Sequence, residues 1–136
     1  MTNNPNHEKI NYVEFAANDL NATKAFFEEA FGWSFQDFGP DYTAFNHQGL
    51  DGGFFKAEGA SVQAKGGALI VLFSNDLDST QQKIKAAGGV ITQDTYEFPG
   101  GERFHFTEPS GNEFAVWGQL ELAKLVFLLE TARLKT

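Results

Sequence analysis

Residues 100–117 bring together the side chains best suited to chemistry. They predict two strands joined by a tight turn at 109–112, where proline presets φ and glycine or asparagine tolerates positive φ. Because side chains alternate between the faces of a strand, one face of this hairpin is apolar and belongs to a core. The other face carries Arg103, His105, Thr107, Glu113, Ala115 and Trp117. This mixture of charge, imidazole and indole suits the wall of a ligand cavity.

Three of the chain's polar residues have side chains that can act on a ligand. The guanidinium of Arg103 can clamp an anionic oxygen. His105 can accept or donate a proton near neutral pH, and Glu14 can act as a base or as a hydrogen-bond acceptor. Each has a structural alternative. Glu14 and Arg103 can form an exposed ion pair worth about 0–1 kcal/mol, and His105 can be a strand histidine at the rim.

The elements that position these residues follow one plan twice. In the first half we expect a strand at 10–16, a helix at 22–31 ending at Gly32, and strands at 33–38, 42–46 and 52–56. In the second half we expect a strand at 68–73, a helix at 78–87, a strand at 90–98 and then the hairpin.

An internal repeat supports this plan. The segment 18–23 returns 57 residues later as 75–80, and the same offset carries Gly32 onto Gly89. One strand–helix–three-strand unit cannot bury both faces of its sheet. We therefore expect two units that pack together, with the helices outside and a cup between the sheets. The alternative is a chance match between two runs of small polar helix-capping residues.

The paired units, the Asn-Asp-Leu helix starts, the run Phe31-Gly32-Trp33 and the turn Thr107–Asn112 resemble the vicinal oxygen chelate superfamily. That group includes glyoxalase I, bleomycin-resistance proteins, fosfomycin-resistance transferases and extradiol dioxygenases. The resemblance covers residues 10–117, and Glu108 and Ser110 are mild departures from its usual turn sequence. It implies an α+β fold of two βαβββ modules forming a cupped eight-stranded mixed sheet, and commonly a homodimer.

The metal enzymes of this superfamily place histidine or glutamate at four cup positions. The resemblance puts these positions at Tyr12, Leu69, Ala115 and, with a looser alignment, Gly53 or Phe55. Leucine and alanine cannot coordinate a divalent ion, and only tyrosine among these residues has a usable oxygen. We therefore expect no metal site and no other cofactor.

The fosfomycin-resistance branch implies that Glu14, Arg103 and His105 border the ligand. We take Glu14 and His105 as candidate catalytic residues. The candidate ligand-binding residues are Tyr12, Leu69, Phe73, Arg103, Ala115 and Trp117. Aromatic side chains in the cup suit a planar or apolar ligand, although they can equally be core filling.

The resemblance favours a small-molecule binding protein without the usual metal. The main alternative is a lyase or isomerase of the same fold that uses Glu14 and His105, or a metal held unconventionally. A protein that sequesters a drug-like molecule is a third hypothesis. Turnover distinguishes the enzyme from the binding proteins, because an enzyme converts its substrate and a binding protein releases its ligand unchanged.

The amino-acid composition excludes several classes of binding partner. The net charge of −8 argues against nucleic acid, which requires clustered lysine and arginine. No apolar run approaches the roughly 18 residues of a membrane span, and no signal peptide is visible in the polar leader 1–9. The absence of cysteine rules out disulfides and thiolate chemistry. We expect a cytoplasmic protein that binds neither nucleic acid nor membranes.

The last segment, 119–136, departs from the minimal superfamily pattern. Leu122, Leu125, Val126 and Leu129 follow helical spacing, which predicts an amphipathic helix. This helix either packs on its own domain or forms a dimer contact. The predicted organisation is a disordered leader at 1–9, one domain at 10–118 with modules 10–57 and 67–118, and the C-terminal helix.

Overall fold

The computed structural model describes residues 3–120 and 129–134. Residues 129–134 are helical, in agreement with the predicted C-terminal helix, whereas Leu122, Leu125 and Val126 lie outside the described residues. No helix in the described part of the chain is both long and apolar enough to cross a membrane.

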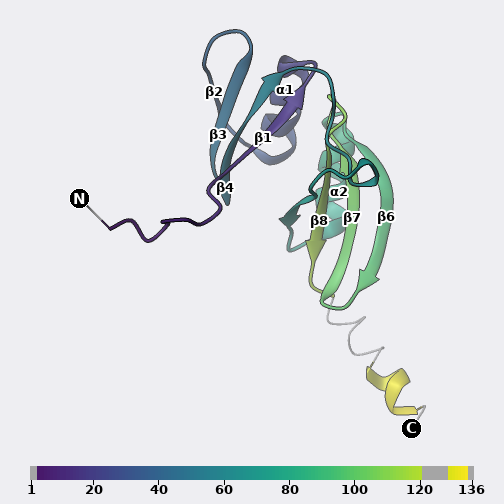
Figure 1. Ribbon diagram of the computed structural model, residues 1–136. Coiled ribbons are helices and arrows are strands. Elements are labelled where there is room, and N and C mark those ends of the chain that lie inside the picture. Colours follow the sequence, from purple (N-terminus) through teal and green to yellow (C-terminus); the bar gives the residue numbers. More distant parts are fainter. Residues whose placement is uncertain (1–2, 121–128, 135–136) are drawn as a thin grey trace.

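The eight strands form two four-stranded sheets (Figure 1). The first module consists of β1 (Tyr12–Ala17), α1 (Leu20–Phe31), β2 (Phe35–Asp37), β3 (Tyr42–Gln48) and β4 (Leu50–Lys56). A linker with a short 3-10 turn, η1 (Gln63–Lys65), leads to the second module. That module consists of β5 (Ile70–Phe73), α2 (Leu77–Ala86), β6 (Val90–Phe98), β7 (Gly101–Thr107) and β8 (Glu113–Gly118).

The two sheets have the same topology, which confirms the internal repeat. Their strand orders are β1-β4-β3-β2 and β5-β8-β7-β6. In each sheet the first strand of the module pairs parallel with the last, and the other pairs are antiparallel. The predicted fold class, two βαβββ modules with a further C-terminal helix, is therefore confirmed.

Equivalent caps start both helices. The carboxylate of Asp19 accepts a hydrogen bond from the backbone N–H of Ala22 at 3.0 Å, and Asp76 accepts one from Ser79 at 3.1 Å. At the other end, the left-handed glycine after α1 is Gly32, with φ of 73°.

The offset of the repeat shortens by one residue at the helix ends. Gly88 has φ of 98° and is the conformational equivalent of Gly32. Gly89 does not have positive φ, and its N–H bonds the carbonyl of Ile84, as the N–H of Trp33 bonds that of Phe27. The sequence match of Gly32 to Gly89 is therefore wrong by one position, because the second helix is shorter than the first.

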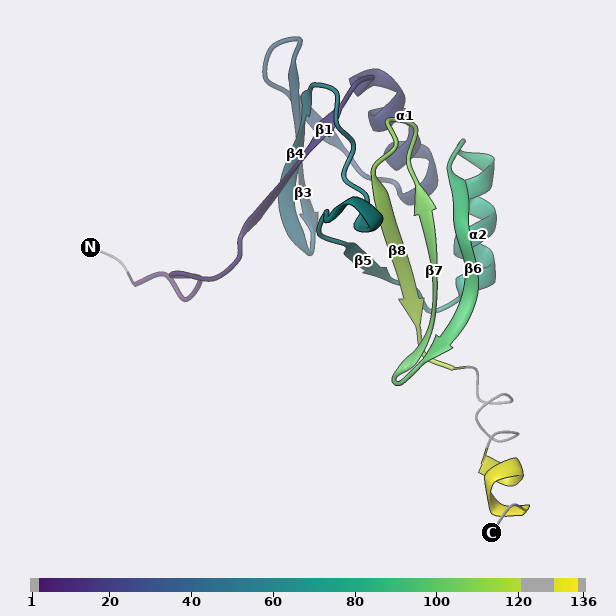
Figure 2. The ribbon, with the colours of Figure 1, turned by 45° about the vertical axis from the view of Figure 1, so that its right-hand side comes forward.

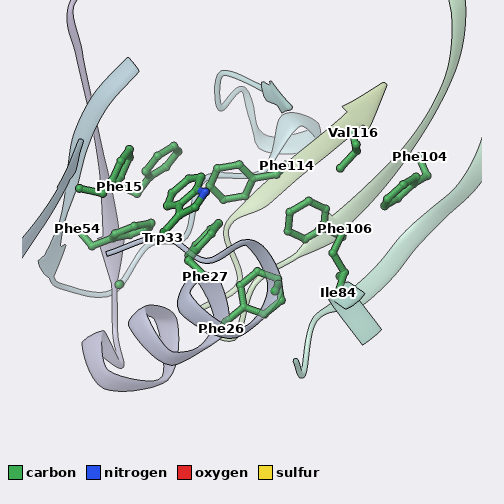
Figure 3. Close-up of a cluster of buried hydrophobic side chains, with 13 residues drawn as sticks. Phe15, Phe26, Phe27, Trp33, Phe54, Ile84, Phe104, Phe106, Phe114 and Val116 are labelled. Atoms are coloured by element: carbon green, nitrogen blue, oxygen red, sulfur yellow. The ribbon is translucent and has the colours of Figure 1, made fainter. Parts of the chain in front are cut away.

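One aromatic core joins both modules (Figure 3). Phe27 of α1 lies 5.6 Å from Phe54 of the first sheet and 5.4 Å from Phe114 of the second, measured between ring centroids. Phe15 of β1 also contacts Phe114 at 5.1 Å. The predicted apolar face of the hairpin belongs to this core, since Phe104, Phe106, Phe114 and Val116 are all buried.

The position of the helices differs from our expectation. Because α1 packs between the two sheets, the helix-bearing faces share the core and the helices do not lie outside it. The opposite face of each sheet, which we call its open face, is turned away from this core. The two open faces therefore do not enclose a common cup within one chain. The physical reason is that phenylalanines on the helix-bearing faces of both modules pack against each other.

Candidate functional site

The open face of the second sheet carries a row of four side chains, one from each strand. In the strand register Phe73 lies opposite Trp117, Trp117 opposite Arg103, and Arg103 opposite Tyr96. We call Phe73, Trp117, Arg103 and Tyr96 the aromatic row. Since neighbouring strands lie about 4.8 Å apart, the row runs from an apolar end at β5 to a phenol at β6.

The side chains of the aromatic row contact one another and remain partly accessible. The rings of Phe73 and Trp117 meet edge to face at 4.9 Å. The guanidinium carbon of Arg103 lies 5.4 Å from the ring centroid of Tyr96 and 5.6 Å from that of Phe98, within the range of cation–π attraction. Phe73 is 52% exposed, and the other three residues of the row are half-buried.

His105 lies beside the aromatic row and forms hydrogen bonds with both Glu113 and Tyr96. Its Nδ1 is 2.9 Å from Oε2 of Glu113, and its Nε2 is 2.9 Å from Oη of Tyr96. Nε of Arg103 donates a further hydrogen bond to the same Tyr96 oxygen. These contacts form a continuous chain of hydrogen bonds from Glu113 through His105 and Tyr96 to Arg103, which we call the relay.

The carboxylate at the end of the relay is held ionised. Burial alone would raise the pKa of Glu113, but hydrogen bonds from the backbone N–H of Gln63 and from His105 bring the pKa below its ordinary value. The bond from Gln63 reaches Oε1 at 2.8 Å, while His105 occupies Oε2. Each oxygen of this carboxylate therefore has a donor of its own.

The linker before β5 covers part of this face. The N–H of Ser61 donates to the Asn112 side chain at 2.8 Å, and the N–H of Gln63 donates to Glu113. Figure 2 shows η1 next to β8 and above β5. Consequently His105 is only 2% exposed and Ala115 is fully buried, although both belong to the open face. The accessible part of the face is the aromatic row.

The sequence analysis did not predict Tyr96 as a site residue, and an irregularity in strand β6 explains why. Gln93 lies opposite His105 and Tyr96 opposite Arg103, so three steps along β6 match two steps along β7. This bulge brings Tyr96 to the open face, where strict alternation would place Thr95. Bulges have weak sequence signals, so alternation alone could not find this residue.

The open face of the first sheet holds a second polar group. Oη of Tyr12 lies 2.5 Å from Oη of Tyr42. The pKa of Tyr42 is raised, first by burial and then by hydrogen bonds with Tyr12 and Glu14. The Tyr42 phenol also lies directly over Gly53, where a side chain would collide with it. Tyr12 and Glu14 are both exposed.

The predicted site residues therefore fall into two groups. The second open face carries Arg103, His105, Ala115, Trp117 and Phe73, and Leu69 directly precedes β5. Tyr12 and Glu14 lie on the first open face. The ion pair considered for Glu14 and Arg103 is not among the salt bridges of the described residues.

An apolar cavity lies elsewhere. It measures about 480 Å³, and its walls are mainly apolar side chains of the helix-bearing faces, including Val13, Phe15, Trp33 and Phe114. Of the residues predicted from the sequence, only Phe73 lines it. This cavity carries no group suited to chemistry, so we place the candidate site on the aromatic row and the relay.

A match to a protein-family model shows which family the chain belongs to. The model of the Glyoxalase/Bleomycin resistance protein/Dioxygenase superfamily matches residues 9–116. The chain belongs to this superfamily. No curated protein sequence matches it at a significant level.

Solved structures with the superfamily fold resemble the molecule closely in shape and weakly in sequence. A glyoxalase-related enzyme from Fulvimarina pelagi has a TM-score of 0.67 at 18% identity, covering 82% of this chain and 88% of that one. Lactoylglutathione lyase from Agrobacterium tumefaciens has a TM-score of 0.64 at 17% identity, covering 82% and 93%. At such identities the likeness extends to the fold alone.

The residues at the superfamily's metal positions do not fit a metal ion in this chain. Tyr12 bonds Tyr42, Ala115 offers only a methyl group, and Leu69 has no donor atom. In the described residues 3–120 and 129–134, no three histidine, aspartate or glutamate side chains are grouped to hold an ion. We therefore derive no chemistry through a metal at this site.

Proposed function

We propose that this superfamily member binds a small, planar, anionic molecule along the aromatic row, without using the superfamily metal. The observation that carries the proposal is the in-register placement of Trp117 beside Arg103. An aromatic ring can pack on Trp117 and Phe73 while its acidic substituent reaches Arg103 one strand further on.

The charge on Arg103 supports an anionic ligand. Its Nε is engaged by Tyr96, and no carboxylate within the described residues forms a salt bridge with its guanidinium. A partly buried guanidinium is a recurrent binding site for planar anions.

We further propose that a second copy of the chain completes the cup. Both open faces expose large apolar side chains: Tyr12 is 45% and Phe55 41% exposed on the first, and Val71 is 40% and Phe73 52% exposed on the second. Glu14 on the first face and Arg103 on the second have opposite charges. The first sheet of one copy packed over the second sheet of another would bring these residues around one ligand.

An enzyme remains the second candidate because His105 bonds both a carboxylate and a phenol. In that case the protein is a lyase or isomerase. Glu14 would take part only from the other copy, since it lies on the open face that is turned away from His105.

Fluorescence titration tests the binding proposal. A nitroaromatic anion such as 4-nitrobenzoate should quench the protein's emission saturably, and Trp117→Phe should remove most of that signal. Trp33 is the internal control because it is buried in the core. Quenching that survives Trp117→Phe unaltered would place the ligand elsewhere.

A matched pair of ligands tests the role of Arg103. Loss of a charge-assisted bond costs about 1.5–3 kcal/mol, so Arg103→Met should weaken 4-nitrobenzoate binding by roughly tenfold or more. Binding of the neutral 4-nitrobenzyl alcohol should change little. Equal losses for both ligands would exclude Arg103 as the anion contact.

A further inference from the structure

We propose that Tyr96 is a catalytic acid–base residue that moves a proton to and from a bound aromatic carbon acid, with His105 and Glu113 as its positioning residues. This inference rests on the proposed function, because the substrate has to bind along the aromatic row. It assigns the chemistry to a residue outside the superfamily's metal positions. The substrate class is a planar aromatic compound with an acidic C–H whose conjugate base carries its charge on oxygen.

The hydrogen bonds of the relay have one consistent direction. The Glu113 carboxylate is ionised and can only accept, so Nδ1 of His105 carries the hydrogen in that bond. In a neutral imidazole Nε2 is then an acceptor, and it receives the O–H of Tyr96. Nε–H of Arg103 donates to the same phenol oxygen. Each hydrogen therefore has an acceptor, and Tyr96 donates to a base.

This order of groups is that of a carboxylate–imidazole–hydroxyl triad in which a phenol takes the place of the nucleophilic alcohol. Proton transfer from Tyr96 to Nε2 makes an imidazolium that is stabilised by Glu113. The resulting phenolate lies beside the Arg103 guanidinium. Both charges that form in this step already have a partner of opposite sign in place.

The reaction balances without another reactant. The phenol proton passes to His105, and the phenolate oxygen takes the proton from the substrate C–H. The C–H bond breaks, and its electron pair moves through the conjugated system to the substrate's oxygen, which faces Arg103. Delivery of the Tyr96 proton to another atom of the conjugated anion gives the isomerised product, and His105 then returns its proton to Tyr96. Alternatively the anion leaves, and His105 gives its proton to water.

The local structure is organised around this oxygen. The bulge in β6 is what brings Tyr96 opposite Arg103, and such irregularities often re-aim a side chain at a functional site. Tyr96 is half-buried, whereas His105 behind it is 2% exposed. A substrate on the row can thus reach the phenol, and water has little access to the imidazole.

The proposal is tested with 5-nitrobenzisoxazole, a planar carbon acid whose deprotonation breaks its N–O bond and releases a coloured phenolate. General acid–base catalysis is worth about 100-fold or more, so Tyr96→Phe should lower kcat/KM by about 100-fold. Thr95→Val, which removes a hydroxyl from the neighbouring position of the same strand, should leave the rate unchanged. 4-Nitrobenzoate should inhibit the reaction competitively.

Two results would overturn the inference: no elimination above the buffer rate with the wild-type protein, or elimination that Tyr96→Phe does not reduce. If either occurs while 4-nitrobenzoate still binds with quenching of Trp117, the proposed binding function stands and only the proton transfer fails. Absence of any binding to the row would instead remove the proposed function itself.

A spectroscopic measurement keeps the proposal testable if Tyr96→Phe does not fold. Nitrogen NMR of the wild-type imidazoles should show His105 with a protonated Nδ1 and an unprotonated Nε2. His7 and His47 are exposed and provide the reference signals. The opposite tautomer would contradict the relay, because Tyr96 would then have no base.

Discussion

The hydroxyl of Thr23 donates a hydrogen bond of 2.7 Å to the carboxylate of Glu108, joining the first turn of α1 to the turn between β7 and β8. Both residues are almost fully buried. The same carboxylate accepts from the N–H of Ser110 at 2.7 Å and from the Asn112 side chain at 2.9 Å. The amide of Asn112 also donates to the carbonyl of Ala16 at 2.7 Å. One turn of the second module is thereby fastened to two elements of the first.

Glu108→Ala should destabilise the protein by about 3 kcal/mol, because it leaves several buried donors without an acceptor. Urea unfolding measures the change through the midpoint of the transition. Glu29→Ala is the control, since Glu29 is exposed on α1 and surface substitutions stay within about 0.5 kcal/mol. Equal values for the two variants would show that the buried network contributes nothing to stability.

The sequence predicted the modules because their signals are local. Alternation separated Phe104 and Phe106, which belong to the core, from Arg103 and His105, which lie on the open face. The helix caps and the repeat offset located α1 and α2 to within about two residues. The same turn sequence that suggested the fold also contains Glu108, but its bond to Thr23 spans 85 positions, and no local pattern predicts such a contact.

The candidate site was predicted in part. Arg103, His105 and Trp117 were found because they alternate within one regular hairpin. Tyr96 was missed because bulges in β6 change the phase of the alternation. The expected cup was wrong for a single chain because the packing of Phe27 between two sheets depends on how the modules dock, which the periodicity of each strand does not specify.

The protein should be a dimer in solution. Light scattering at micromolar concentration should give about twice the chain mass of 15.0 kDa. Phe73→Asp should shift the dimer towards monomer, because it places a charge on an apolar open face. Val90→Asp, at the outer strand of the same sheet, is the matched control.

Other results would change this assignment. A monomer of the wild-type protein would contradict the completed cup. A dimer that survives Phe73→Asp but is lost in Leu125→Asp would move the contact to the C-terminal segment.

Stability at high pH should depend on Tyr42. A raised pKa means that the folded state favours the neutral phenol, held by burial, Tyr12 and Glu14. Its contribution to stability is therefore fully present below the ordinary tyrosine pKa of about 10 and is lost as the pH rises above that value. Between about pH 8 and pH 11 the wild type should lose more unfolding free energy than Tyr42→Phe. Parallel losses in the two proteins would show that Tyr42 titrates normally.

Stability at low pH should depend on Glu113 in the opposite sense. Its pKa is lowered by the bonds from Gln63 and His105, which outweigh the effect of burial. The contribution is present above the ordinary glutamate pKa of about 4.3 and is lost as the pH falls through the lower, folded-state value. Glu113→Gln should accordingly flatten the acid limb of the stability profile. An unchanged acid limb would mean that Glu113 is not held ionised by the relay.

Added metal ions should leave the fold and the binding of 4-nitrobenzoate unaffected. Chemistry of the glyoxalase type needs a Lewis acid, and a catalytic ion keeps about three protein ligands and an open position. Here Leu69 and Ala115 offer no donor, and Glu14 and Glu113 each lie two residues, roughly 6–7 Å, along their strands from the superfamily positions. We expect purified protein without stoichiometric nickel, zinc, manganese or iron, and no thermal shift when these ions are added.

The test is sensitive, because an ion at about 100 times its dissociation constant would stabilise the fold by about 2.7 kcal/mol. Elemental analysis near one ion per chain, lost together with activity in Glu14→Ala or His105→Ala, would replace the binding proposal with a metal-dependent enzyme.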